Sequence, residues 1–120
     1  DHRIVANIDL APTFVDFAGS PVPSTMDGIS LVPLLRDANI DGRDSILIEH
    51  WPTEEGLGSR IPEFYVVRTS DWKYVEYVTG EKELYDLQND PYELNNLAGD
   101  EQYQALMAEL KAKLDELKAQ

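Results

Sequence analysis

The sequence contains no cysteine among its 120 residues, and its 10 Lys and Arg are outnumbered by 23 Asp and Glu. The absence of cysteine excludes a disulfide framework, a thiolate metal site, an iron–sulfur cluster and a cysteine nucleophile within these residues. The formal net charge of −13 repels the phosphates of nucleic acids and of anionic lipids. We therefore expect neither nucleic acid nor a membrane surface as a partner.

Long apolar runs and recognisable catalytic motifs are also missing. No run approaches the roughly 20 apolar residues of a membrane span. No G-x-S-x-G motif occurs, no glycine loop could hold a phosphate, and there are only two histidines. No set of nucleophile, base and orienting residue can be assembled, so the sequence predicts no catalytic residue.

Two stretches suggest a metal site, and neither meets the requirements for one. Asp1 and His2 are adjacent on an extended chain, so their side chains would lie on opposite sides. A calcium loop that began at Asp86 would need Gly and Glu where Pro91 and Leu97 stand. The sequence therefore predicts no metal ligand. Its first residue is Asp rather than an initiator Met, which favours a processed product or a part of a longer chain.

The first 44 residues predict two short helices separated by a Pro-rich segment. Asp9 can cap the first helix, at 9–18, by accepting hydrogen bonds from free backbone amides. Ser30 can cap the second helix, at 30–36, in the same way. The apolar side chains of the first helix share one face: Leu10, Phe14, Phe17 and Ala18.

The remaining residues, 45–120, predict an antiparallel sheet followed by a long helix. Short apolar, β-branched or aromatic runs indicate strands at 46–48, 64–69, 72–77 and 83–87. Asp100 begins a helix that continues to about Lys118. Its apolar stripe comprises Tyr103, Leu106, Leu110, Leu114 and Leu117. The order of elements is typical of an α+β fold, with about four strands packed on the C-terminal helix. The alternative is that the stripe binds a partner helix, which would make the chain a non-enzymatic acidic interaction module.

His50 and Trp51 stand where the first predicted strand meets a loop rich in Gly and Pro. Binding residues concentrate at strand ends and in the loops that follow them. Together with Arg60, an indole face, an imidazole and a guanidinium could hold a sugar or an anionic group. The alternative is a packed Trp and a hydrogen-bonded His with structural roles only.

Two blocks of sequence, 7–35 and 67–97, resemble successive parts of one enzyme family. The shared motifs are Asn7-Ile8-Asp9-Leu10-Ala11-Pro12-Thr13-Phe14, Asp27-Gly28-Ile29-Ser30-Leu31, Trp72-Lys73-Tyr74 and Glu83-Leu84-Tyr85-Asp86-Leu87. In this order and spacing they resemble type I, formylglycine-dependent sulfatases of the alkaline-phosphatase-like superfamily. The resemblance covers roughly residues 4–115. It implies that 1–44 ends a large α/β catalytic domain and that 45–120 is the C-terminal subdomain.

The resemblance also implies a function for the complete enzyme, which is hydrolysis of sulfate esters of carbohydrates. The C/S-x-P-x-R motif that supplies the formylglycine is absent, so we expect this chain to have no catalytic centre and no cofactor of its own. Calcium and formylglycine are implied for the full-length enzyme. The implied partners are the rest of the catalytic domain and the sulfated sugar, and the chain alone could self-associate.

Three residues become candidate substrate contacts on this resemblance, because the family's small subdomain lines the active-site cleft. They are His50, Trp51 and Arg60. An alternative within the same superfamily is the C-terminal part of a phosphonate or phosphodiester hydrolase. The resemblance favours an exported protein, periplasmic or secreted.

Overall fold

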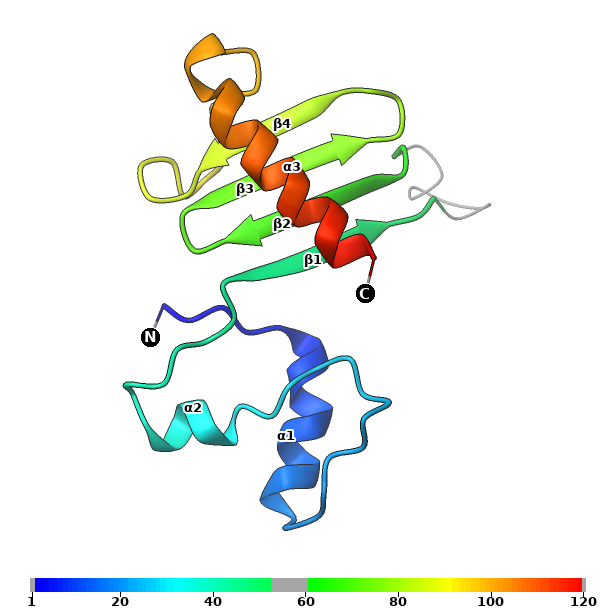
Figure 1. Ribbon diagram of the computed structural model, residues 1–120, viewed down its shortest axis with the longest axis vertical. Coiled ribbons are helices and arrows are strands. Elements are labelled where there is room, and N and C mark those ends of the chain that lie inside the picture. Colours follow the sequence, from blue (N-terminus) through cyan, green and yellow to red (C-terminus); the bar gives the residue numbers. More distant parts are fainter. Residues whose placement is uncertain (1, 53–60, 120) are drawn as a thin grey trace. The chain divides into compact units, whose positions relative to one another are not determined.

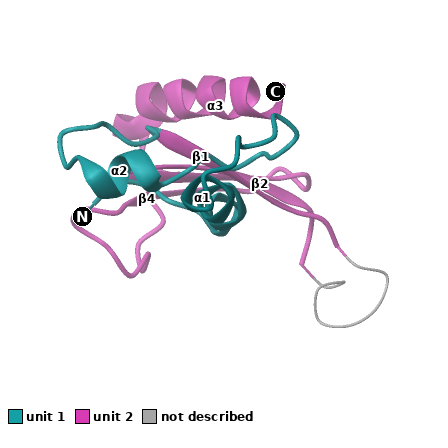
Figure 2. Cartoon of the chain, turned by 90° about the horizontal axis from the view of Figure 1, so that it is seen from below, with its two compact units in different colours: residues 1–44 teal, residues 45–120 magenta. Residues whose placement is uncertain are grey.

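The computed structural model describes residues 2–52 and 61–119. The chain divides into two compact units, Asp1–Asp44 and Ser45–Gln120, which are coloured separately in Figure 2. The division falls after Asp44, where the sequence changes from segments that predict helices to segments that predict strands.

The first unit is built from two short helices. The 3-10 turn η1 (Asn7–Asp9) leads directly into α1 (Leu10–Phe17), and α2 (Val32–Arg36) follows a long irregular segment. The helix expected at 30–36 therefore begins two residues later. The backbone N–H of Leu31 donates to the Thr13 side chain at 2.8 Å, and Ser30 Oγ accepts from Val32 N at 3.2 Å, at the first residue of α2.

The apolar face of α1 is exposed rather than buried within this unit. Leu10, Phe14 and Phe17 are 50%, 66% and 59% exposed. The buried residues of α1 are Pro12 and Thr13. An apolar helix face left in water is typical of a surface that another part of a protein covers.

The second unit is an antiparallel sheet covered on one face by a helix (Figure 1). Its strands, in spatial as well as chain order, are β1 (Ser45–His50), β2 (Phe64–Thr69), β3 (Trp72–Tyr77) and β4 (Lys82–Asp86). β2 and β3 occupy the residues expected from the sequence. β1 is longer than expected, and β4 is displaced by one residue from 83–87.

One face of the sheet packs against α3 (Gln104–Lys118), which follows the 3-10 turn η3 (Glu101–Tyr103). Asp100 caps this start, since its carboxylate accepts from Gln102 N at 3.0 Å. The register aligns residues of all four strands in one row, and two leucines of α3 pack on that row. The fully buried members of this cluster are Val67, Tyr74, Leu84, Leu110 and Leu114. The apolar stripe of the helix is therefore the core of the unit.

A charge placed in this stripe distinguishes a core from a partner-binding face. Leu110 is only 5% exposed, so Leu110→Asp would bury an unpaired carboxylate and lose the packing of a leucine. We expect it to cost more than about 3 kcal/mol and to abolish the cooperative unfolding of the sheet, measured by circular dichroism during urea denaturation.

The matched control is Ala112→Asp, which adds the same charge at an exposed position of α3. It should change the free energy of unfolding by no more than about 0.5 kcal/mol. A Leu110→Asp variant as stable as the wild type would contradict the assignment of the stripe to the core.

Candidate functional site

The candidate site lies at the end of the sheet where β1 stops and β2 begins. The register pairs His50 with Phe64, and Phe64 with Tyr77, so three rings lie side by side across three strands. Successive residues of a strand alternate between the two faces of a sheet. His50 and Trp51 therefore have different neighbours, although they are adjacent in the sequence.

His50 belongs to the face opposite α3. Its ring stacks on Phe64, with centroids 5.0 Å apart and planes inclined by 22°. Phe64 in turn contacts Tyr77 at 5.4 Å. The hydroxyls of Tyr77 and Tyr85 both donate to the carboxylate of Glu83, at 3.2 and 3.1 Å. Burial, followed by the bond to Glu83, raises the pKa of Tyr85 to about 12, so this tyrosine is a permanent donor.

One polar atom in this row is buried and unsatisfied. Nε2 of His50 has no hydrogen-bond partner within the described part of the chain. A buried polar atom without a partner costs about 1–3 kcal/mol. His50 is therefore ready to bond a group that the described residues do not supply.

Trp51 belongs to the face that carries α3. Its ring meets Tyr65 edge to face, at a centroid distance of 6.5 Å and an angle of 90°. The Lys118 ammonium lies 3.4 Å from the centre of the Tyr65 ring, and the Tyr65 hydroxyl donates to Glu63. That hydrogen bond is the main cause that raises the pKa of Tyr65. Arg60, the third candidate from the sequence, lies outside the described residues.

A cavity of about 390 Å³ lies between α3 and the strands β3 and β4. Its lining residues are Tyr74, Lys82, Ala98, Gln104, Met107, Ala108 and Lys111. Both lysines pair with Glu76 at 3.4 Å, and Lys111 also pairs with Asp115 at 2.9 Å. Two cations facing two carboxylates leave no net charge, so the cavity is not suited to a sulfate or a carboxylate ligand.

Neither metal-binding clusters nor membrane spans occur in the portions described, 2–52 and 61–119. No three or more His, Asp or Glu side chains there lie close enough together to hold a metal ion. No helix in these portions is both long and apolar enough to cross a bilayer. Asp86 and Asp90 instead accept hydrogen bonds from nearby backbone amides, those of Gln88 and Asn95 among them.

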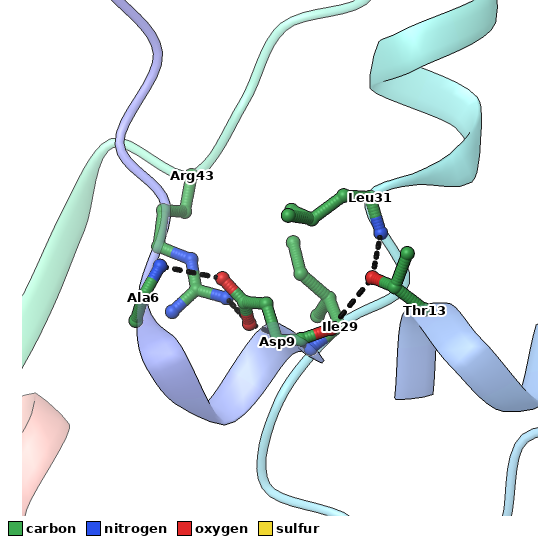
Figure 3. Close-up of polar contacts among 6 residues, drawn as sticks. All are labelled: Ala6, Asp9, Thr13, Ile29, Leu31 and Arg43. Atoms are coloured by element: carbon green, nitrogen blue, oxygen red, sulfur yellow. Dashed lines mark hydrogen bonds and ion pairs between the residues drawn. The ribbon is translucent and has the colours of Figure 1, made fainter. Parts of the chain in front are cut away.

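The most buried acid, Asp9, organises the first unit (Figure 3). Its Oδ1 accepts from the backbone N–H of Ile29 at 2.9 Å and from the Arg43 guanidinium, and its Oδ2 accepts from Ala6 N at 2.8 Å. Thr13 completes the network, donating to the Asp9 carbonyl at 2.6 Å. The expectation that the Asp9 side chain caps α1 is wrong. This carboxylate ties together three chain segments that are distant in sequence.

The electrostatics of Asp9 are those of a structural ion rather than a catalytic acid. Burial by itself would raise the pKa of Asp9, but the amides of Ile29 and Ala6 and the Arg43 guanidinium hold it below the ordinary value. Both carboxylate oxygens are occupied, and the side chain is fully buried. Gly28 is part of the same arrangement, because a Cβ there would lie 2.1 Å from the Ile8 carbonyl oxygen. The sequence did not predict this network, because Asp9, Gly28 and Arg43 are far apart in the chain and form no recognisable local motif.

Comparison with known proteins places this fold in the sulfatase class. The family model described as "N-sulphoglucosamine sulphohydrolase, C-terminal" matches residues 1–120. The N-acetylglucosamine-6-O-sulfatase of Bacteroides thetaiotaomicron is 36% identical over 124 residues, covering 98% of this chain and 22% of that protein. Human arylsulfatase K is 35% identical over 101 residues, covering 80% of this chain and 19% of its own length.

Solved structures give the same result. BT4656, determined in complex with its substrate D-glucosamine-2-N,6-O-disulfate, superposes with a TM-score of 0.82 and 34% identity over 92% of this chain and 23% of that chain. The phosphonate monoester hydrolase of Agrobacterium radiobacter superposes with a TM-score of 0.74 and 31% identity, over 92% of this chain and 24% of that one. The α+β fold expected from the sequence is confirmed.

The chain belongs to the N-sulphoglucosamine sulphohydrolase C-terminal family. It spans about a fifth to a quarter of the length of the relatives that it matches. The resemblance to sulfatases is thereby confirmed, and the reading as a separate interaction module is not favoured.

The Asp9 network yields a stability prediction for the first unit. Asp9→Asn keeps the shape of the side chain but removes the charge that Arg43 and two amides share. We expect the first unit to lose about 3 kcal/mol, measured by amide hydrogen exchange of residues 2–44. Because the pKa of Asp9 is lowered, its contribution is present above about pH 4 and disappears as the pH falls through the folded-state value.

Asp41→Asn removes an exposed carboxylate from the same unit and is the matched control. Its exchange rates should match those of the wild type. Unchanged protection in Asp9→Asn would mean that the network does not organise the unit.

Proposed function

We propose that this chain is the C-terminal part of a sulfatase that hydrolyses sulfate esters of carbohydrates. Its role is to complete the fold and to form one wall of the substrate cleft. The observation that carries this proposal is that the whole chain matches a segment of longer sulfatases, and this segment is a quarter or less of their length. One of these relatives is named for N-acetylglucosamine. A second relative, 36% identical over 97% of this chain, is named Delta 4,5-hexuronate-2-O-sulfatase, so two named substrates are sugars.

The exposed face of α1 supports the completing role. Three large apolar side chains, Leu10, Phe14 and Phe17, lie in water in a unit that buries few residues. On this proposal the remainder of the catalytic domain covers them. The chain by itself would then self-associate through this face.

Calcium and formylglycine do not fit the residues present here. The described residues form no metal-binding cluster, and the sequence has no C/S-x-P-x-R motif. On this proposal both groups belong to the rest of the enzyme. The residues of this chain would orient the sugar and exclude water from the cleft wall, and they would take no part in transfer of the sulfuryl group.

The end of the sheet at His50 and Trp51 is the described part of this chain that we place at the cleft; Arg60, outside the described residues, stays a candidate from the sequence. The unpaired Nε2 of His50 supports a hydrogen bond to a group outside the described residues. The exposed indole of Trp51 supports contact with a sugar ring. Because the two side chains lie on opposite faces, they would contact different parts of the substrate.

A second candidate function is hydrolysis of phosphonate monoesters. The Agrobacterium enzyme supports it, because its identity of 31% is close to that of the sulfatases. The two reactions differ in the group at the catalytic centre, which this chain does not contain. The family match favours the sulfatase.

A chimeric enzyme tests the proposed function. Residues 1–120 would replace the matching part of the Bacteroides N-acetylglucosamine-6-O-sulfatase. We expect this chimera to release sulfate from N-acetylglucosamine 6-sulfate, and the 120-residue chain alone to release none. The same assay with a phosphonate monoester tests the second candidate.

The parent enzyme with its matching part deleted is the control, and it should be inactive because α1 and the sheet are missing. Sulfate release by the 120-residue chain alone would contradict the proposal. So would a soluble, folded chimera with no turnover of either substrate.

A conservative change at His50 tests its hydrogen bond in the same chimera. His50→Phe keeps a ring for stacking on Phe64 but removes both nitrogens. Loss of one hydrogen bond should lower kcat/KM about tenfold, mainly through KM.

Ile48→Ala, on the same strand and face, trims an apolar side chain and should leave KM unchanged. An unchanged kcat/KM in His50→Phe would show that the imidazole has only a packing role.

A further inference from the structure

The helix side of the candidate site holds an exposed indole beside several hydrogen-bonding groups. We define the Trp51 platform as Trp51, Tyr65, Glu49, Glu63 and Lys118. β1 and β2 bring the first four together, since Glu49 pairs with Tyr65 in the register and Glu63 directly precedes β2. Lys118 comes from the last turn of α3.

The indole of Trp51 is held in place and yet open to solvent. Its contact with Tyr65 is edge to face, and the Tyr65 ring is fixed by Lys118 over its centre. Trp51 nevertheless remains 57% exposed. A large aromatic surface fixed by its neighbours loses little conformational freedom when a ligand covers it.

The polar groups around the indole are mostly acceptors. The carboxylate of Glu63 accepts from the Tyr65 hydroxyl, and Glu49 is exposed beside it. An ionised carboxylate only accepts hydrogen bonds. A ligand at this place must therefore bring donors, and hydroxyl groups are the donors that sugars carry.

The charge of the platform selects against an anionic ligand. Its two carboxylates outnumber the single ammonium of Lys118, and that ammonium lies against the Tyr65 ring. The whole chain carries −13, so no wider positive field offsets this repulsion.

We propose that the Trp51 platform binds an uncharged sugar ring. The C–H face of the ring lies against the indole, and its hydroxyls donate to Glu49 and Glu63. The inference rests on the proposed function for the source of the sugar, which is an unsulfated unit of the substrate. The Trp51 platform would then bind an unsulfated unit of the substrate, and the sulfate would lie in another part of the cleft.

The fluorescence of the two tryptophans tests this inference on the 120-residue chain without any turnover. Trp72→Phe leaves Trp51 as the only indole, while Trp51→Phe leaves Trp72, which packs against Tyr103. N-acetylglucosamine and its 6-sulfate are the probes, because they differ by one charged group. We expect the neutral sugar to change Trp51 emission with half-saturation on the order of 10 mM, and the sulfated sugar to bind about threefold more weakly at low salt.

The Trp51→Phe variant should respond to neither sugar. Tighter binding of the sulfated sugar, weakened by salt, would overturn the inference in favour of an anion site at Lys118. No response to either sugar up to about 100 mM would overturn it outright. Indole N–H signals of the wild-type chain, assigned with Trp51→Phe, give the same readout if Trp72→Phe fails to fold. An active chimera without sugar binding here would leave the proposed function intact and sink this inference alone.

Discussion

The antiparallel register of β1 to β4 is the constraint on which the second unit depends. It aligns Leu47, Val67, Tyr74 and Leu84 in one row across the four strands. α3 packs on that row and buries the apolar side chains on its face of the sheet. Because side chains alternate along a strand, this packing also fixes the opposite face and both ends of the sheet. The division between His50 and Trp51 follows from it, since a slip of one residue would exchange their environments.

The first unit is stabilised mainly by polar contacts rather than by an apolar core. It is too small to bury many apolar side chains, and it joins its segments through polar groups. Arg3 donates to the carbonyls of Leu34 and Ile40, each at 2.9 Å, and Asp9 holds Ala6, Ile29 and Arg43. Hydrogen bonds to charged groups in partly buried sites contribute more than neutral ones. Because these polar contacts hold the segments together, the apolar face of α1 is not needed for packing within the unit and stays exposed.

Sequence reasoning succeeded where the signal is local. The strands at 64–69 and 72–77 and the start of the last helix at Asp100 follow from aromatic runs, a turn and a cap, and the structure confirms each of them. It failed where partners are distant. Nothing near Asp9 in the sequence indicates Ile29 or Arg43, so the same residue looked like a helix cap.

The arrangement of the candidate residues could not be predicted from the sequence, for a related reason. A strand end followed by a loop identified His50 and Trp51, yet their neighbours depend on β2, whose register the sequence does not state. Tyr65, Glu63 and Lys118 could not be assigned to Trp51 without it. Alternation along β1 alone would have separated the two side chains, and this signal was present in the sequence.

The charge of the chain limits what it can contribute to a sulfatase. Lys82 and Lys111 face Glu76, Lys73 pairs with Glu93, and Arg43 is bound to Asp9. These cations are already neutralised, and a sulfate that displaced their partners would leave carboxylates unpaired. On the proposed function, these four cations would not bind sulfate, and the positive groups that do so would come from elsewhere in the enzyme. An acidic wall would still assist sulfate binding. It would accept hydrogen bonds from sugar hydroxyls and repel the sulfate, and so favour the orientation in which the sulfate points toward the cations.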